Sequence, residues 1–127
     1  MKLVTDAVHE LEAAMRFRTA RQGVLAGNVA NADTPRYRAR DLVFESVLDQ
    51  ERLPMVGTHA RHLSAGSAQQ RPYELVVGPK GDGPDRNGVS LDDELIRMSR
   101  NAGAYQDQAD ILSRLLGLMR SAIAGEG

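Results

Sequence analysis

The 127-residue sequence contains no cysteine and no tryptophan, and aromatic residues make up only 4% of it. The lack of cysteine excludes disulfides and thiolate metal ligands. The lack of bulky aromatic side chains leaves little material for a large buried core in a chain of this length. We therefore expect one small domain at most, and a protein that assembles rather than one built around a deep core.

A strong net charge and long apolar runs are also absent. The chain has 16 Lys and Arg against 17 Asp and Glu, a formal net charge of −1, which argues against nucleic-acid binding through bulk electrostatics. No apolar run approaches the ~20 residues that span a bilayer, and the first residues lead into an amphipathic pattern rather than a signal-peptide core. We expect no nucleic-acid partner, no membrane span and no cleaved secretory signal peptide.

A long amphipathic helix is predicted over residues 1–31. Apolar side chains recur there at alternating spacings of four and three, which places them along one side of a helix. This first seam comprises Val4, Val8, Leu11, Met15, Leu25 and Val29. Arg18 and Gln22 interrupt it. Two interpretations remain open: their polar heads reach water, or they fix the register of the helix or meet a carboxylate of a partner.

A second helix is predicted over residues 91–127, with Ser90 and Asp93 spaced as a capping box at its start. Its seam comprises Leu91, Leu95, Met98, Ala102, Tyr105, Ala109, Leu112, Leu116, Met119 and Ile123. An extra apolar stripe comprises Ile111, Leu115, Leu118 and Ala122. A hairpin of two helices buries one seam per helix, so the extra stripe predicts further helices around it, from neighbouring subunits or from the middle of the chain.

The middle of the chain supplies little apolar material. Residues 73–77 have the length and β-branched content of a short strand, and Gly and Pro punctuate the segments around them. The predicted fold is mainly α: long N- and C-terminal helices form an antiparallel coiled-coil pair, with a short irregular or β-rich middle segment. The three parts, residues 1–31, 32–90 and 91–127, are expected to form a single assembly domain.

The segment after the first helix is dense in turn-forming and basic residues. Asn28 and Asn31 lie where amide side chains can bond the last free carbonyls of a helix, and Pro35 stops the helix. In an extended segment alternate residues share one face. If residues 36–40 are extended, one face of the segment is basic and comprises Arg36, Arg38 and Arg40. Its predicted contact on a neighbouring subunit comprises Asp92, Asp93 and Glu94. The alternative is a solvated basic loop, because exposed ion pairs often contribute less than ~1 kcal/mol.

No residue pattern points to catalysis or to a bound cofactor. His59 and His62 have the spacing of a helical metal pair, but no cysteine exists and no carboxylate supports them within their segment. The serines lack a nucleophile-elbow context, and no glycine pattern follows a strand to hold phosphate. We therefore predict that the protein is not an enzyme and has no catalytic residues, cofactor or metal.

The segment that follows the first helix resembles the motif of the bacterial flagellar axial proteins, the family of rod and hook subunits. The residues that carry the resemblance are Asn28, Ala30, Asn31, Asp33, Thr34, Pro35, Tyr37, Arg38 and Asp41. The short length and the Ala-Asp-Thr-Pro variant of the motif are most similar to the proximal rod. One position departs from the family pattern: Arg36 stands where glycine is usual, and arginine takes positive φ less readily than glycine.

The resemblance implies a structural subunit of the proximal rod in the periplasmic basal body, which polymerises into a helical axial assembly and transmits torque. It implies self-association, contacts with other rod subunits and, at the proximal end, with ring or export-gate adaptor proteins. It also implies export through the flagellar type III apparatus without a cleaved signal peptide. The alternatives are another rod subunit of similar length, or a cytosolic helical-hairpin adaptor, which explains the seams but not residues 31–41.

Overall fold

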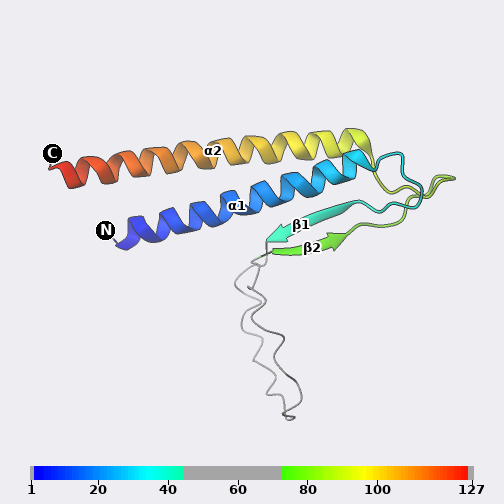
Figure 1. Cartoon of the computed structure of the whole chain (residues 1–127), viewed down its shortest axis with the longest axis horizontal. Helices are drawn as coiled ribbons and strands as arrows, with labels where there is room; N and C mark the ends of the chain where they lie inside the picture. The colour runs from blue at the N-terminus through cyan, green and yellow to red at the C-terminus, as the bar shows by residue number, and fades with distance from the viewer. Residues whose placement is uncertain (1, 45–72, 126–127) are drawn as a thin grey trace, which may run out of the picture.

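Two long helices and a small sheet make up the part of the chain that the computed structural model describes, residues 2–44 and 73–125. The order of elements is helix α1 (Lys2–Ala30), strand β1 (Arg40–Phe44), strand β2 (Tyr73–Val77) and helix α2 (Leu91–Ala124). The helices run antiparallel and side by side, and the sheet lies along another side of α1 (Figure 1). The predicted mainly α fold, with two packed helices and a small β element between them, is confirmed.

The ends of the helices follow the local sequence signals. The side-chain amide of Asn31 donates to the carbonyl of Gly27 at 2.8 Å and so caps the last turn of α1. Ser90 is extended, and its hydroxyl accepts from the backbone N–H of Asp93 at 3.5 Å, so the predicted cap of α2 is confirmed. Gly125 ends α2 in the left-handed conformation, with φ 69°.

The sheet is anchored on α1 by an aromatic cluster. Strands β1 and β2 pair antiparallel, with Leu42 opposite Leu75 and Phe44 opposite Tyr73. The side chain of Phe17 in α1 is 7% exposed. Its ring meets Phe44 edge-on with centroids 5.3 Å apart, and its centroid lies 5.8 Å from that of Tyr73. The sheet therefore covers a second side of α1, which the seam spacing did not predict.

The first seam is at least partly buried along the whole of α1, and Leu25 in it is fully buried. The predicted seam of α2 behaves differently. Leu95, Leu116 and Ile123 are 49%, 48% and 73% exposed. Within the single chain α1 therefore does not cover these residues, and their role in an assembly seam stays a prediction. Met98, Leu112 and Met119 are half-buried, and Tyr105 is exposed.

The buried side chains of α2 are polar instead. They are Glu94 and Asn101, and each is 2% exposed. The physical reason is that α1 presents amide groups, those of Asn28 and Gln22, to which these two side chains hydrogen-bond. Buried polar groups require such partners. The inner face of α2 is therefore mixed: Glu94 and Asn101 are buried there, and half-buried apolar residues such as Met98 and Leu112 lie along the same face.

The extra apolar stripe of α2 is also largely uncovered. Ile111 and Leu118 are 49% and 67% exposed. Predictions that concern residues 45–72, including the His59 and His62 pair, lie outside the described residues.

Phe17→Ala tests the anchor of the sheet. Removal of a buried ring that touches two other rings is expected to lower the free energy of unfolding by about 3 kcal/mol, measured by urea titration followed by circular dichroism. Val43→Ala on the same sheet, where the side chain is 51% exposed, is the matched control and is expected to cost less than about 1 kcal/mol. Equal losses for the two variants would contradict the anchoring role.

Candidate functional site

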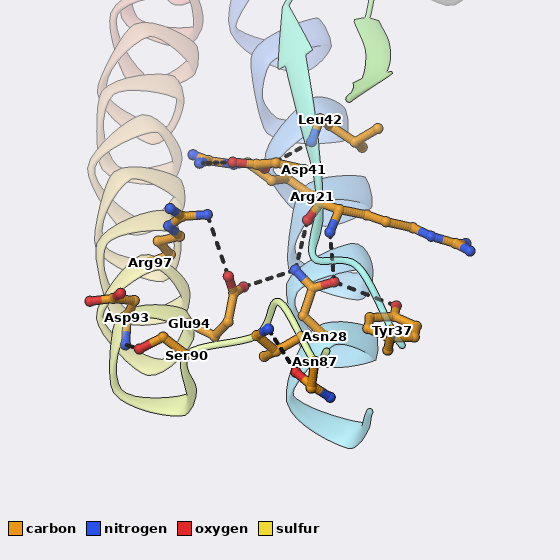
Figure 2. Close-up of polar contacts among 12 residues, drawn as sticks. Arg21, Asn28, Tyr37, Asp41, Leu42, Asn87, Ser90, Asp93, Glu94 and Arg97 are labelled. Atoms are coloured by element: carbon orange, nitrogen blue, oxygen red, sulfur yellow. Dashed lines mark hydrogen bonds and ion pairs between the residues drawn. The ribbon is translucent and has the colours of Figure 1, made fainter. Parts of the chain in front are cut away.

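Asn28, in the last turn of α1, is fully buried, and its amide is bonded on every side. Its Oδ1 accepts the backbone N–H of Arg40 at 2.9 Å and the hydroxyl of Tyr37 at 3.5 Å. Its Nδ2 donates to the backbone carbonyl of Arg40 at 2.7 Å and to Oε2 of Glu94 at 2.9 Å. Figure 2 shows the amide between β1 and α2. The side chain pairs with β1 as a neighbouring strand would, and it holds α2 as well.

Glu94 completes this contact from α2. Its Oε2 accepts from Asn28, and its Oε1 lies 3.4 Å from the guanidinium of Arg97. The sequence placed Glu94 in a contact with a neighbouring subunit. The structure instead places its carboxylate inside the chain, because Asn28 supplies the donor that a buried carboxylate needs. Asp92 and Asp93, the other two acidic residues of that prediction, are exposed.

Asn87 forms a second amide clamp, between the end of α1 and the start of α2. Its Nδ2 donates to the carbonyls of Asn31 and Thr34 at 3.0 and 2.7 Å, and its Oδ1 accepts from the backbone N–H of Val89 at 2.7 Å. The backbone N–H of Gly88, the residue after Asn87, donates to the carbonyl of Tyr37 at 2.9 Å. The motif loop is thereby fixed to the segment that leads into α2. The sequence did not single out this contact, since its partners are 56 and 53 positions away.

Arg21 and Asp41 tie β1 to the middle of α1. Two parallel hydrogen bonds of 2.7 Å join the guanidinium to the carboxylate, and the backbone N–H of Leu42 donates to the same carboxylate at 2.8 Å. Burial alone would raise the pKa of Asp41, but the hydrogen bonds and charge of Arg21 outweigh it and lower that pKa. The same hydrogen bonding raises the pKa of Arg21. Asp41 belongs to the predicted motif, whereas its partner was not predicted.

Arg36, which stands where the resemblance of the motif implies glycine, lies in a turn. Its φ is 61°, in the left-handed region, and its backbone N–H donates to the carbonyl of Asp85 at 2.9 Å. The three arginines therefore do not share the face of one extended segment, as the sequence predicted, because only Arg40 lies in β1. They nevertheless line one hollow. This arginine hollow comprises Arg36, Tyr37, Arg38, Arg40, Leu75 and Val77.

A second polar contact joins the helices nearer their middle. The Nδ2 of Asn101 donates to the carbonyl of Arg18 and to Oε1 of Gln22, both at 2.8 Å. Of the two interpretations of the interrupted seam, register-fixing is therefore correct for Gln22. Together with the bond between Asn28 and Glu94, this contact sets the position of α2 along α1 at two separate points.

The described residues show neither a metal site nor a membrane span. Over residues 2–44 and 73–125, no three His, Cys, Asp or Glu side chains gather in a way that suits a metal ion. Neither described helix is long and apolar enough to cross a bilayer. At the joint between α1, β1 and α2, the side chains of Asn28 and Asn87 bond backbone groups of other segments.

Asn28→Ala tests the central clamp. The change leaves the buried backbone groups of Arg40 without their side-chain partner and removes the donor to Glu94. We expect the free energy of unfolding to fall by about 3 kcal/mol. Asn31→Ala, which removes a cap at the end of the same helix, is the control and is expected to cost about 1 kcal/mol. A urea titration of both variants that gave equal losses would rule out a special role for Asn28.

The pair formed by Arg21 and Asp41 predicts a dependence of stability on pH. Because the folded chain lowers the pKa of Asp41, the ionised pair stabilises the fold above the ordinary carboxyl value of about 3.9, and this stabilisation disappears as the pH falls through the lower folded-state pKa. Asp41→Asn should therefore reduce the thermal stability at neutral pH, with a gap to the parent that shrinks below about pH 4. Asp33→Asn, at an exposed position of the same loop, is the control. A gap that stays constant down to acid pH would contradict the assignment.

Comparison with known proteins gives the family. No protein-family model matches the chain. The chain is 36% identical over 112 residues to the flagellar basal body rod protein FlgB of Aquifex aeolicus, with 87% of each chain covered. It is 34% identical over 117 residues to that of Yersinia enterocolitica, across 84% of this chain and 85% of the relative. It is 27% identical over 127 residues to that of Bacillus subtilis, across 98% of each. The chain therefore belongs to the family of the flagellar basal body rod protein FlgB.

Proposed function

We propose that this chain polymerises into the helical axial assembly of the proximal rod and transmits torque through it. The chain is a structural rod protein and not an enzyme. We infer further that the subunits associate through exposed apolar side chains of α2. The observation that carries it is the orientation of α2, which buries Glu94 and Asn101 against α1 and leaves many of its large apolar side chains exposed.

The exposed aliphatic residues of α2, called here the outward row, form one group near the start of the helix and one near its end. Its exposed apolar residues, 46% to 73% accessible, are Leu91, Leu95, Ile96, Ile111, Leu116, Leu118 and Ile123. The helix has 34 residues, so the row extends over about 50 Å at a rise of about 1.5 Å per residue. Exposed apolar groups of this kind mark interaction sites on a protein surface. The partners must therefore cover apolar side chains near both ends of α2.

Copies of the same chain meet this requirement in a rod. A contact between two different surfaces of identical subunits is heterologous, and it repeats without closing when the rotation between copies does not complete a ring. Toward the end of α2 the exposed residues cover a wide arc, since Leu116 and Leu118 are both exposed. One neighbouring helix does not cover such an arc, so we assign more than one neighbour to this part of α2.

The proposal places the subunit in the periplasmic rod, after export through the flagellar type III apparatus without cleavage of a signal peptide. Its partners are copies of itself, other rod subunits and, at the proximal end, ring or export-gate adaptor proteins. Membership in the rod-protein family supports these assignments.

Leu116→Asp tests the assembly role of the outward row. The side chain is 48% exposed, so the charge should leave the helicity and melting temperature of the single chain nearly unchanged, while assembly fails because a carboxylate is buried between copies. The measurement is rod formation, by electron microscopy of basal bodies, and motility in cells whose own copy has been replaced. Leu112→Asp should also block assembly, with some loss of stability because Leu112 is half-buried.

Ser113→Asp is the matched control, since it adds the same charge at an exposed polar position of α2. We expect it to preserve rods and motility. Normal rods with Leu116→Asp would overturn the assignment of this row to assembly.

A further inference from the structure

The arginine hollow combines positive charge with exposed aliphatic surface. Three guanidinium groups and Tyr37 line it, together with Leu75 and Val77 of β2, which are 48% and 44% exposed. No carboxylate is among its lining residues. Arg38 is held in place by a 2.7 Å hydrogen bond from its Nε to the carbonyl of Gly78. A partner that fits this hollow therefore carries acidic groups beside aliphatic side chains.

The first turn of α2 has this composition. Asp92 and Asp93 are exposed there, and Leu91, Leu95 and Ile96 beside them are 46%, 49% and 50% exposed. The ion pairs found within residues 2–44 and 73–125 involve neither these two carboxylates nor the arginines of the hollow. Within one chain, Asp93 and Arg40 both line another hollow, between β1 and the start of α2, but no ion pair joins them. Both charged surfaces are thus available to a second molecule.

The position of the two surfaces suits a contact between copies. Figure 1 shows the sheet and α2 on different sides of α1, with the first turn of α2 at the same end of the helix pair as the loops that follow α1 and β2. A second copy displaced sideways, across the helix axes, brings its α2 toward the sheet of the first. The same displacement can be repeated, which gives a heterologous series of copies.

We propose that the arginine hollow of one copy receives the first turn of α2 from a second copy. Asp92 and Asp93 lie at the guanidinium groups, and the aliphatic residues of that turn cover the exposed side chains of β2. The charges fix the register of the contact, since guanidinium and carboxylate groups pair with directional hydrogen bonds. This inference rests on the proposed function and names one of the contacts through which the rod subunits associate.

The absence of cysteine from the chain gives a direct test by disulfide formation. Val77→Cys marks the hollow, Leu95→Cys marks α2, and both changes leave every charge in place. The two variants are prepared separately and mixed under mild oxidation, so that a bond within one chain is impossible. A disulfide requires Cα atoms roughly 4–7 Å apart, and it therefore reports adjacency. We expect the mixed dimer to form at least about tenfold faster than either homodimer.

The matched control pairs Val77→Cys with Leu118→Cys, which lies at an exposed position of α2 far from its first turn. This mixture should give only background crosslinking. Predominant homodimers of Val77→Cys would mean that β2 pairs with β2, and would overturn the proposal. Equal yields from Leu95→Cys and Leu118→Cys would overturn it as well.

A charge reversal tests the ionic part of the contact. Asp92→Arg, added to the Leu95→Cys chain, should lower the yield of mixed dimer about fivefold or more through like-charge repulsion. Arg36→Asp, added to the Val77→Cys chain, should restore it, and Asp tolerates the left-handed turn at this position. A loss that the reversed pair does not recover would contradict the assignment. If crosslinking fails while Leu116→Asp still blocks rods, the contact is wrong and the proposed function stands.

Discussion

The arrangement of the chain depends on one buried amide, that of Asn28. Its Nδ2 donates to the backbone carbonyl of Arg40 and to the carboxylate of Glu94, and its Oδ1 accepts from the backbone N–H of Arg40 and the hydroxyl of Tyr37. A side chain that only donates or only accepts would leave buried groups without partners, and each such group costs free energy. This one contact joins the segment that follows α1, strand β1 and the inner face of α2 at a single point.

Local signals in the sequence predicted both helices and strand β2, but not strand β1. The spacing of apolar residues indicated both helices, Ser90 indicated the start of α2, and the run that ends at Val77 indicated a strand. The inner face of α2 was not predictable in the same way. Apolar spacing assigns the apolar row to the contact between the helices, whereas Glu94 bonds a partner 66 positions away and Asn101 one 79 positions away. Nothing local in the sequence identifies such pairs.

The motif after α1 was recognisable, but the roles of its residues depend on the tertiary structure. Both Asn28 and Asn31 were expected at the end of the helix, yet Asn31 caps it and Asn28 clamps other elements. Arg21 was not predicted, because its partner Asp41 comes close only after the chain has turned back. At Arg36 an arginine takes the left-handed conformation, and its backbone N–H is bonded to the carbonyl of Asp85.

The polar contacts between α1 and α2 also determine how the hairpin responds to mechanical load. Apolar side chains tolerate small shifts, whereas a hydrogen bond weakens steeply once its atoms move out of line. The bonds of Glu94 and Asn101 lie two turns apart along α2. Axial slip of α2 against α1 therefore stretches both at the same time. The two helices of the hairpin therefore resist shear against each other as one stiff element.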